Sequence, residues 1–126
     1  MKLVETDEFI KAARLNKRIG GQSAAKVLMT VLRINKLNRL YEEISHLKGM
    51  DFIDALIDRL QLDFEVSEDE LAQIPREGAF ITVSNHPFGG IDGMLLVKIL
   101  SRVRPDIRVM SNFVLNKIEP VSEYML

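Results

Sequence analysis

The stretch AFITVSNHPFGGIDGMLLVKIL, residues 79–100, decides the fold that the sequence predicts. Its first part, residues 79–83, is almost entirely apolar or β-branched and predicts a strand that is buried on both faces. From residue 92 to about residue 103, the apolar pattern predicts a helix. Gly89 and Gly90 let the chain turn tightly between the two elements and approach a ligand closely. We expect the functional site in this turn, where α/β proteins commonly bind their ligands.

The turn carries a histidine and an aspartate that can work as a pair. Pro87 disfavours helical geometry at His86 and so places the imidazole on extended backbone. Asp92 falls in the first turn of the next helix, where the helix dipole favours a carboxylate. An aspartate that accepts a hydrogen bond from one ring nitrogen leaves the other nitrogen able to take a proton. The alternative is a turn histidine beside a helix-capping aspartate, and these residues alone leave both interpretations open.

The motif Asn85-His86-Pro87-Phe88-Gly89-Gly90-Ile91-Asp92-Gly93 resembles the first catalytic block of the lysophospholipid acyltransferases, the PlsC-like family. It is most similar to the bacterial hemolysin-like branch that is linked to ornithine- and glycine-lipid synthesis. The His and the Asp are one residue further apart than in most of the family, a spacing that the Gly-Gly form of this branch shares. The resemblance implies that His86 is the general base for a lipid hydroxyl that attacks an acyl thioester, and that Asp92 orients it.

The same resemblance implies the fold, the substrates and the location. The expected fold class is α/β, with an N-terminal helical segment followed by the start of a βαβ three-layer acyltransferase domain. The expected co-substrate is acyl-ACP or acyl-CoA, with no bound cofactor and no metal, and the acceptor is a lysolipid such as lysophosphatidate or a lyso-ornithine or lyso-glycine lipid. We expect a cytoplasmic protein that is peripherally associated with the inner face of the membrane and does not bind nucleic acid.

Several further residues are candidates for substrate binding. A second strand predicted over residues 107–110 would end at the same sheet edge as the turn, which brings Asn112 toward the same pocket. Lys117 follows in a short helical segment, where an ordinary surface lysine is the alternative. The full set of substrate-binding candidates is Asn85, Phe88, Gly89, Gly90, Asn112 and Lys117.

Composition limits the class of protein. The 126 residues are 47% apolar and 28% charged and contain no cysteine, which fits one globular domain and excludes a disulfide framework or a Cys-ligated metal site. Because no apolar run approaches the ~20 residues of a membrane helix, any membrane contact should be peripheral. We expect residues 1–60 to form an N-terminal helical region and residues 61–126 the first part of the acyltransferase domain. The family's later blocks are absent, so we expect a fragment that is inactive alone.

Charge is distributed unevenly along the chain. Residues 11–40 carry eight Lys or Arg and no acid, whereas residues 42–77 carry eleven acids and three bases. A basic block suits lipid headgroups, an acidic carrier protein or nucleic acid, although no aromatic-basic interleaving supports the last. The alternative is a solvated helix face. The alternative function is therefore a non-catalytic lipid- or acyl-carrier-binding module; a phosphate-binding turn and a metal site have weaker support in the motif.

The remaining patterns predict short elements around the central stretch. Residues 23–47 predict one long amphipathic helix, capped by Ser23, that packs into the domain or lies on a bilayer surface. Alternating apolar and acidic residues predict a strand over 62–66. Ser67 with Glu70 forms a capping box that opens a short helix to about Gln73. Two further helices are predicted from about residue 5 to 15 and from 52 to 60.

Overall fold

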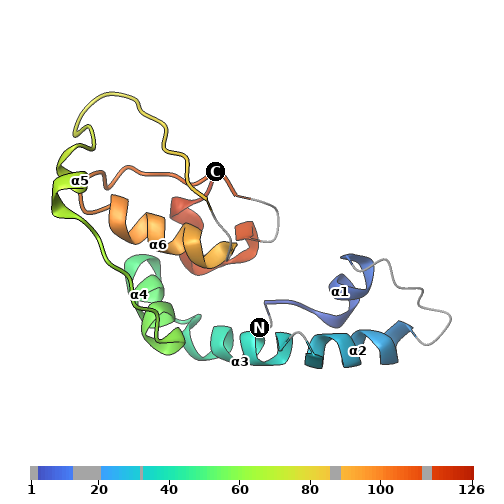
Figure 1. Ribbon diagram of the computed structural model, residues 1–126. Helices are drawn as coiled ribbons and strands as arrows, with labels where there is room; N and C mark the ends of the chain where they lie inside the picture. Colours follow the sequence, from blue (N-terminus) through green and yellow to red (C-terminus); the bar gives the residue numbers. More distant parts are fainter. Residues whose placement is uncertain (1–2, 13–20, 32, 86–88, 112–114) are drawn as a thin grey trace. The chain divides into compact units, whose positions relative to one another are not determined.

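The structure, a computed structural model, describes residues 3–12, 21–31, 33–85, 89–111 and 115–126 (Figure 1). The chain divides into two compact units, Met1–His46 and Leu47–Leu126. The regular elements of the described ranges are all helices. Within these ranges, no helix has the length and apolar content needed to cross a bilayer. The domain boundary predicted near residue 60 stays a prediction.

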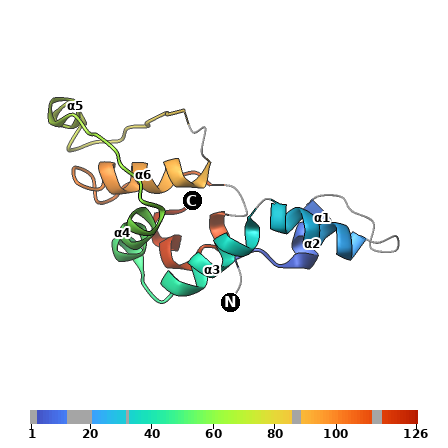
Figure 2. The same cartoon turned by 60° about the horizontal axis from the view of Figure 1, so that its bottom comes forward.

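The described part of the first unit contains three helices: α1 (Thr6–Ala12), α2 (Gly21–Val31) and α3 (Ile34–Ile44). Helix α1 lies beside α2 in both views (Figures 1 and 2). Ile10 of α1 is buried, as are Ala25 and Met29, which lie one turn apart on α2. A stripe with this spacing is how a helix presents one face to its neighbour.

The single helix predicted over residues 23–47 is wrong, because the chain breaks between α2 and α3. Arg33 adopts the left-handed conformation, with φ 54°, and its N–H donates to the Thr30 carbonyl oxygen at 3.1 Å. Ser23, the predicted cap, lies inside α2. The left-handed conformation costs a residue other than glycine about 1–2 kcal/mol, so a break is not expected at an arginine. The apolar repeat continues on both sides of Arg33, and the hydrophobic pattern therefore does not indicate the break.

One buried amide fastens the start of the chain to α3. Asn38 is 5% exposed, the one buried polar residue among those described. Its Nδ2 donates to the Val4 carbonyl oxygen at 2.9 Å, and its Oδ1 accepts from the Val4 N–H, also at 2.9 Å. The side chain therefore satisfies a backbone donor and a backbone acceptor that have no helical partner at this point.

Where the structure describes the second unit, it has five helical segments: α4 (Gly49–Leu60), α5 (Glu68–Ala72), α6 (Gly90–Leu100), η1 (Leu115–Lys117) and η2 (Glu119–Tyr124). Helix α4 packs against α6 and against η2. The core residues of these three segments are Phe52, Ile53, Ile57, Met94, Val97, Leu100 and Val121. Each such side chain contributes about 1.5–3 kcal/mol through burial. An ion pair between Lys98 of α6 and Asp54 of α4 flanks this core.

Local signals in this unit are confirmed. The Ser67 side chain accepts a hydrogen bond from the Glu70 N–H at 3.3 Å, and α5 begins at the next residue. The helix predicted over 52–60 is present and starts three residues earlier. The helix predicted after the motif is also present, as α6.

The predicted α/β fold class, with the start of a βαβ three-layer domain, is wrong for the described residues. Residues 79–83 are extended but belong to no sheet, and Ile81 and Val83 are 93% and 95% exposed instead of buried. Residues 62–66, the other segment predicted as a strand, likewise belong to no sheet. The predicted strand over 107–110 makes one isolated parallel bridge, between Val109 and Met125. A strand requires neighbours for its backbone donors and acceptors, and a sequence pattern reports extended propensity without showing that those neighbours exist.

Replacing Asn38 by alanine should destabilise the protein. Asn38→Ala removes both hydrogen bonds to Val4 and should lower the free energy of unfolding by about 1–3 kcal/mol. Asn35→Ala is the matched control, because Asn35 lies in the same helix and is exposed. Its effect should stay within about 0.5 kcal/mol. Urea unfolding of the three proteins measures the difference, and equal effects of the two substitutions would contradict the role of the amide.

Candidate functional site

On its helix side, the motif has the backbone form that the sequence predicts for the turn. Ser84 and Asn85 end the extended segment and are exposed. Gly89 has φ 65° and ψ −123° and forms the N-cap of α6, which begins at Gly90. A positive φ of this kind is accessible to glycine at little cost. The chain therefore enters α6 through a backbone conformation that the glycine permits, as expected for a tight turn.

Asp92 lies in the first turn of α6, which confirms its predicted position. The positive end of the helix dipole stabilises a carboxylate there. The side chain is partly exposed, while Met94, two residues further along, is buried in the core. The packing of α6 on α4 therefore sets the orientation of the turn that carries Asp92.

The structure describes some of the other predicted site residues and not the rest. His86, Phe88 and Asn112 lie outside the described residues. Asn85 and Gly89 are exposed at the turn, and Gly90 is partly exposed. Lys117 is exposed at the end of η1. The catalytic and binding roles assigned to these residues stay predictions, and the sheet edge that was expected to bring Asn112 to the turn is not formed by the described residues.

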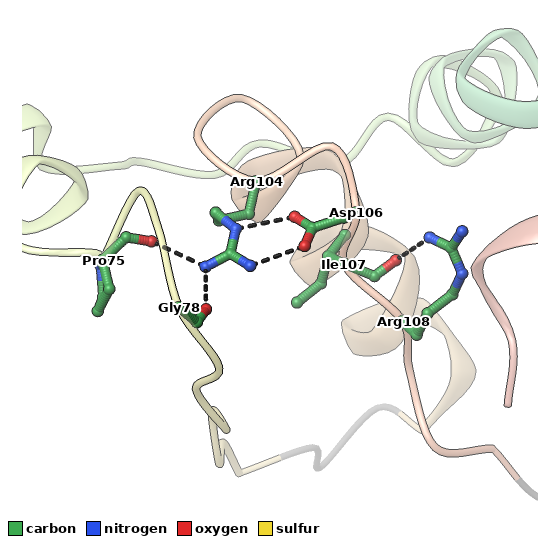
Figure 3. A network of polar contacts seen from close by, with 6 residues as sticks. All are labelled: Pro75, Gly78, Arg104, Asp106, Ile107 and Arg108. Carbon is green, nitrogen blue, oxygen red and sulfur yellow. Dashed lines mark hydrogen bonds and ion pairs between the residues drawn. The ribbon is translucent and has the colours of Figure 1, made fainter.

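The structure also shows an arginine network that sequence patterns did not predict (Figure 3). Arg104 follows α6, and its guanidinium points between two segments of the second unit. On one side, its Nε and Nη2 donate to the two carboxylate oxygens of Asp106, at 2.8 and 2.7 Å. On the other side, its Nη1 donates to the carbonyl oxygens of Pro75 and Gly78, at 3.1 and 2.9 Å. The guanidinium carbon lies 4.7 Å from the centre of the Phe80 ring.

This network ties the start of the extended segment to the end of α6. Bidentate pairing and stacking on an aromatic ring are interactions to which the planar guanidinium is suited and the lysine ammonium is not. The hydrogen bonds between Arg104 and Asp106 raise the pKa of the arginine and lower the pKa of the aspartate. The Arg104 side chain is 12% exposed. From the sequence Arg104-Pro105-Asp106, at most the Arg–Asp pair can be predicted. The carbonyl groups of Pro75 and Gly78 lie more than twenty-five residues away along the chain, so the sequence does not indicate the rest of the network.

A small pocket lies beside this network but does not include the motif. Its volume is about 190 Å³, and it is lined by Glu68, Leu71, Ala72, Arg76, Arg102 and Val103. Arg102 donates to the Glu68 carboxylate at 2.7 Å across it. Asn85, Gly89, Gly90 and Asp92 do not line this pocket.

Gly89 and Gly93 form a matched pair for testing the turn. At both positions a Cβ would meet no atom within 4 Å, but only Gly89 has a positive φ. Gly89→Ala should therefore lower the free energy of unfolding by about 1–3 kcal/mol, because a residue with a Cβ is strained in this backbone conformation. Gly93→Ala, inside α6, should raise it by about 0.5–1 kcal/mol through helix propensity. Chemical unfolding of both variants measures the difference, and effects of the same sign would show that the turn differs from this geometry.

The Arg104–Asp106 pair should make the free energy of unfolding depend on pH in the acidic range. Because the pKa of Asp106 is lowered below its ordinary 3.8, the pair stabilises the folded protein above that pH. The contribution should decline as the pH falls below 3.8 toward the lowered pKa. Asp106→Asn should therefore destabilise the protein at neutral pH and cease to do so in acid. In an Arg104→Gln background the same substitution should have little effect, and an undiminished effect there would contradict the pairing.

Comparison with known proteins supports the family resemblance that the motif suggests. The chain is 31% identical over 102 residues to a lyso-glycine lipid O-acyltransferase of Bacteroides thetaiotaomicron, which covers 79% of this chain and 36% of the relative. It is 32% identical over 75 residues to a protein of the same name from Phocaeicola vulgatus, which covers 60% of this chain and 26% of the relative. The matches thus span roughly a quarter to a third of these curated relatives. No solved structure matches the chain.

A family model described as acyltransferase matches residues 8–126, which is nearly the whole chain. The match includes the extended segment, the motif, α6 and the Arg104 network. The resemblance drawn from the motif is thus confirmed at the level of the family. The chain belongs to the acyltransferase family.

Proposed function

We propose that this protein is an O-acyltransferase that moves a fatty acyl group from a thioester donor to the hydroxyl of a lysolipid. The family match supports acyl transfer, and the two relatives named lyso-glycine lipid O-acyltransferase support a lysolipid acceptor. A lyso-glycine or related amino-acid lipid is therefore the first acceptor to test. Acyl-ACP or acyl-CoA is the proposed donor.

The reaction needs one base and no nucleophile from the protein. In the proposed step, His86 takes the proton from the acceptor hydroxyl as its oxygen attacks the thioester carbonyl carbon. The new ester C–O bond forms, the C–S bond breaks, and the protonated His86 gives its proton to the departing thiolate. Asp92 orients the imidazole and stabilises its protonated form. The chain contains no cysteine, and the donor is already activated as a thioester.

The observation that carries the proposal is the backbone around the motif. Exposed backbone leads up to Asn85, Gly89 within the motif has a positive φ, and α6 follows with Asp92 in its first turn. This arrangement supports a site that is open to a ligand at a helix N-terminus.

A lysolipid acceptor resides in a membrane, so we propose that the protein works from the cytoplasm at the inner membrane face. It would bind there peripherally. The basic block between residues 11 and 40 supports contact with anionic headgroups.

The two histidines of the chain provide the test and its control. His86→Ala should lower the rate of acyl transfer by about 10²–10⁴, the usual contribution of a general base. Asp92→Asn should lower it less, because the base remains. His46→Ala should leave the rate unchanged, since His46 is exposed after α3, far along the chain from the motif. The complete protein is assayed with an acyl thioester and a lyso-glycine lipid, and the acylated product is measured by mass spectrometry.

An unchanged rate in His86→Ala would contradict the role of this residue. If the complete protein binds lysolipid and transfers no acyl group, the non-catalytic lipid-binding function replaces the proposed one. Equal losses in His86→Ala and His46→Ala would indicate that the substitutions act through folding.

A further inference from the structure

Helix α2 exposes an apolar stripe on the side that it does not bury. Val27, Leu28 and Val31 lie on one helical face and are 63%, 39% and 71% exposed. Ala25 and Met29, which the unit buries, lie on the neighbouring face. The sequence pattern left open whether the apolar stripe packs into the domain or lies on a bilayer surface, and among the described residues these three side chains are exposed. We call Val27, Leu28 and Val31 the exposed stripe.

Basic residues flank the exposed stripe along the chain, without an acid in the same stretch of sequence. Lys26 of α2, Arg33 at the break, and Lys36 and Arg39 of α3 are all exposed. No Asp or Glu occurs between residues 11 and 40. Leu37 of α3 adds another large apolar side chain, 40% exposed. The described residues between 21 and 40 thus combine exposed apolar side chains with charged side chains that are all basic.

We propose that the exposed stripe of α2 docks on the surface of an anionic lipid bilayer. Helices that lie in a bilayer surface bury an apolar face at the headgroup boundary and carry Lys and Arg on the polar side. Long basic side chains extend toward the phosphates while their methylene stems remain on apolar surface. Each lysine or arginine near an anionic surface strengthens binding about fivefold. Charge complementarity therefore selects an anionic membrane as the occupant.

This inference extends the proposed function by naming the surface and the lipid charge that would bring the enzyme to its acceptor. It does not depend on the catalytic step. Vesicle binding is measured without an acyl donor, so a failure of acyl transfer and a failure of docking give different results.

The test is cosedimentation of the chain with vesicles made of equal parts of phosphatidylcholine and phosphatidylglycerol, compared with phosphatidylcholine alone. The chain should bind the anionic vesicles more strongly. The combined variant Val27→Ala, Leu28→Ala and Val31→Ala should weaken this binding at least tenfold, roughly the loss expected when seven partly buried carbons are removed. Alanine maintains helix propensity, and circular dichroism checks that α2 is retained.

The matched control is Ile81→Ala with Val83→Ala, which removes exposed β-branched side chains from the second unit. It should leave vesicle binding unchanged. Lys26→Gln with Lys36→Gln should weaken binding to the anionic vesicles about twenty-five-fold and leave the weak binding to phosphatidylcholine unchanged. No binding by the parent chain, equal binding to both vesicle types, or an undiminished affinity in the stripe variant would overturn the proposal.

Discussion

The guanidinium of Arg104 joins the two backbone segments that lead into and out of the motif. It holds the carbonyl groups of Pro75 and Gly78 and lies against Phe80, at the start of the extended segment. Its own backbone continues from the end of α6, where the Arg104 N–H donates to the Leu100 carbonyl oxygen at 2.8 Å. The motif therefore lies between an extended segment and a helix whose far ends are fastened to each other.

This anchor matters because the extended segment has no strand beside it among the described residues. A strand in a sheet is held by a ladder of backbone hydrogen bonds on one or both sides. Here Ile81 and Val83 project into solvent, and the hydrogen bonds of Arg104 to Pro75 and Gly78 hold the start of the segment. On the opposite side, the core residues of α6 and its ion pair with Asp54 hold the helix on α4. Side chains thus provide the support that a sheet would otherwise give.

The sequence predicted features that depend on neighbours along the chain. The Ser67 cap, the glycine turn at Gly89 and the position of Asp92 follow from interactions within a few residues, and the structure has all three. The break at Arg33, the Val4–Asn38 hydrogen bonds and the Arg104 network depend on conformations or partners that a periodic pattern does not report. The predicted sheet was wrong for the same reason, because the strand propensity of residues 79–83 does not show whether a neighbouring strand is present to pair with them. For the candidate site, the sequence correctly predicted the glycine turn and the helix that carries Asp92. The roles of His86 and Asp92 stay predictions that rest on the motif and on the family.

Direct transfer between donor and acceptor is tested most closely by counting thiol release in the first turnover of the complete protein. If the lipid hydroxyl itself attacks the thioester, free thiol should be released only when lysolipid is present, in an amount equal to the ester formed. A burst of thiol before lysolipid is added would indicate an acylated protein intermediate. That burst, or thiol release without formation of an ester, would contradict the proposed role of His86 as a base acting on the acceptor.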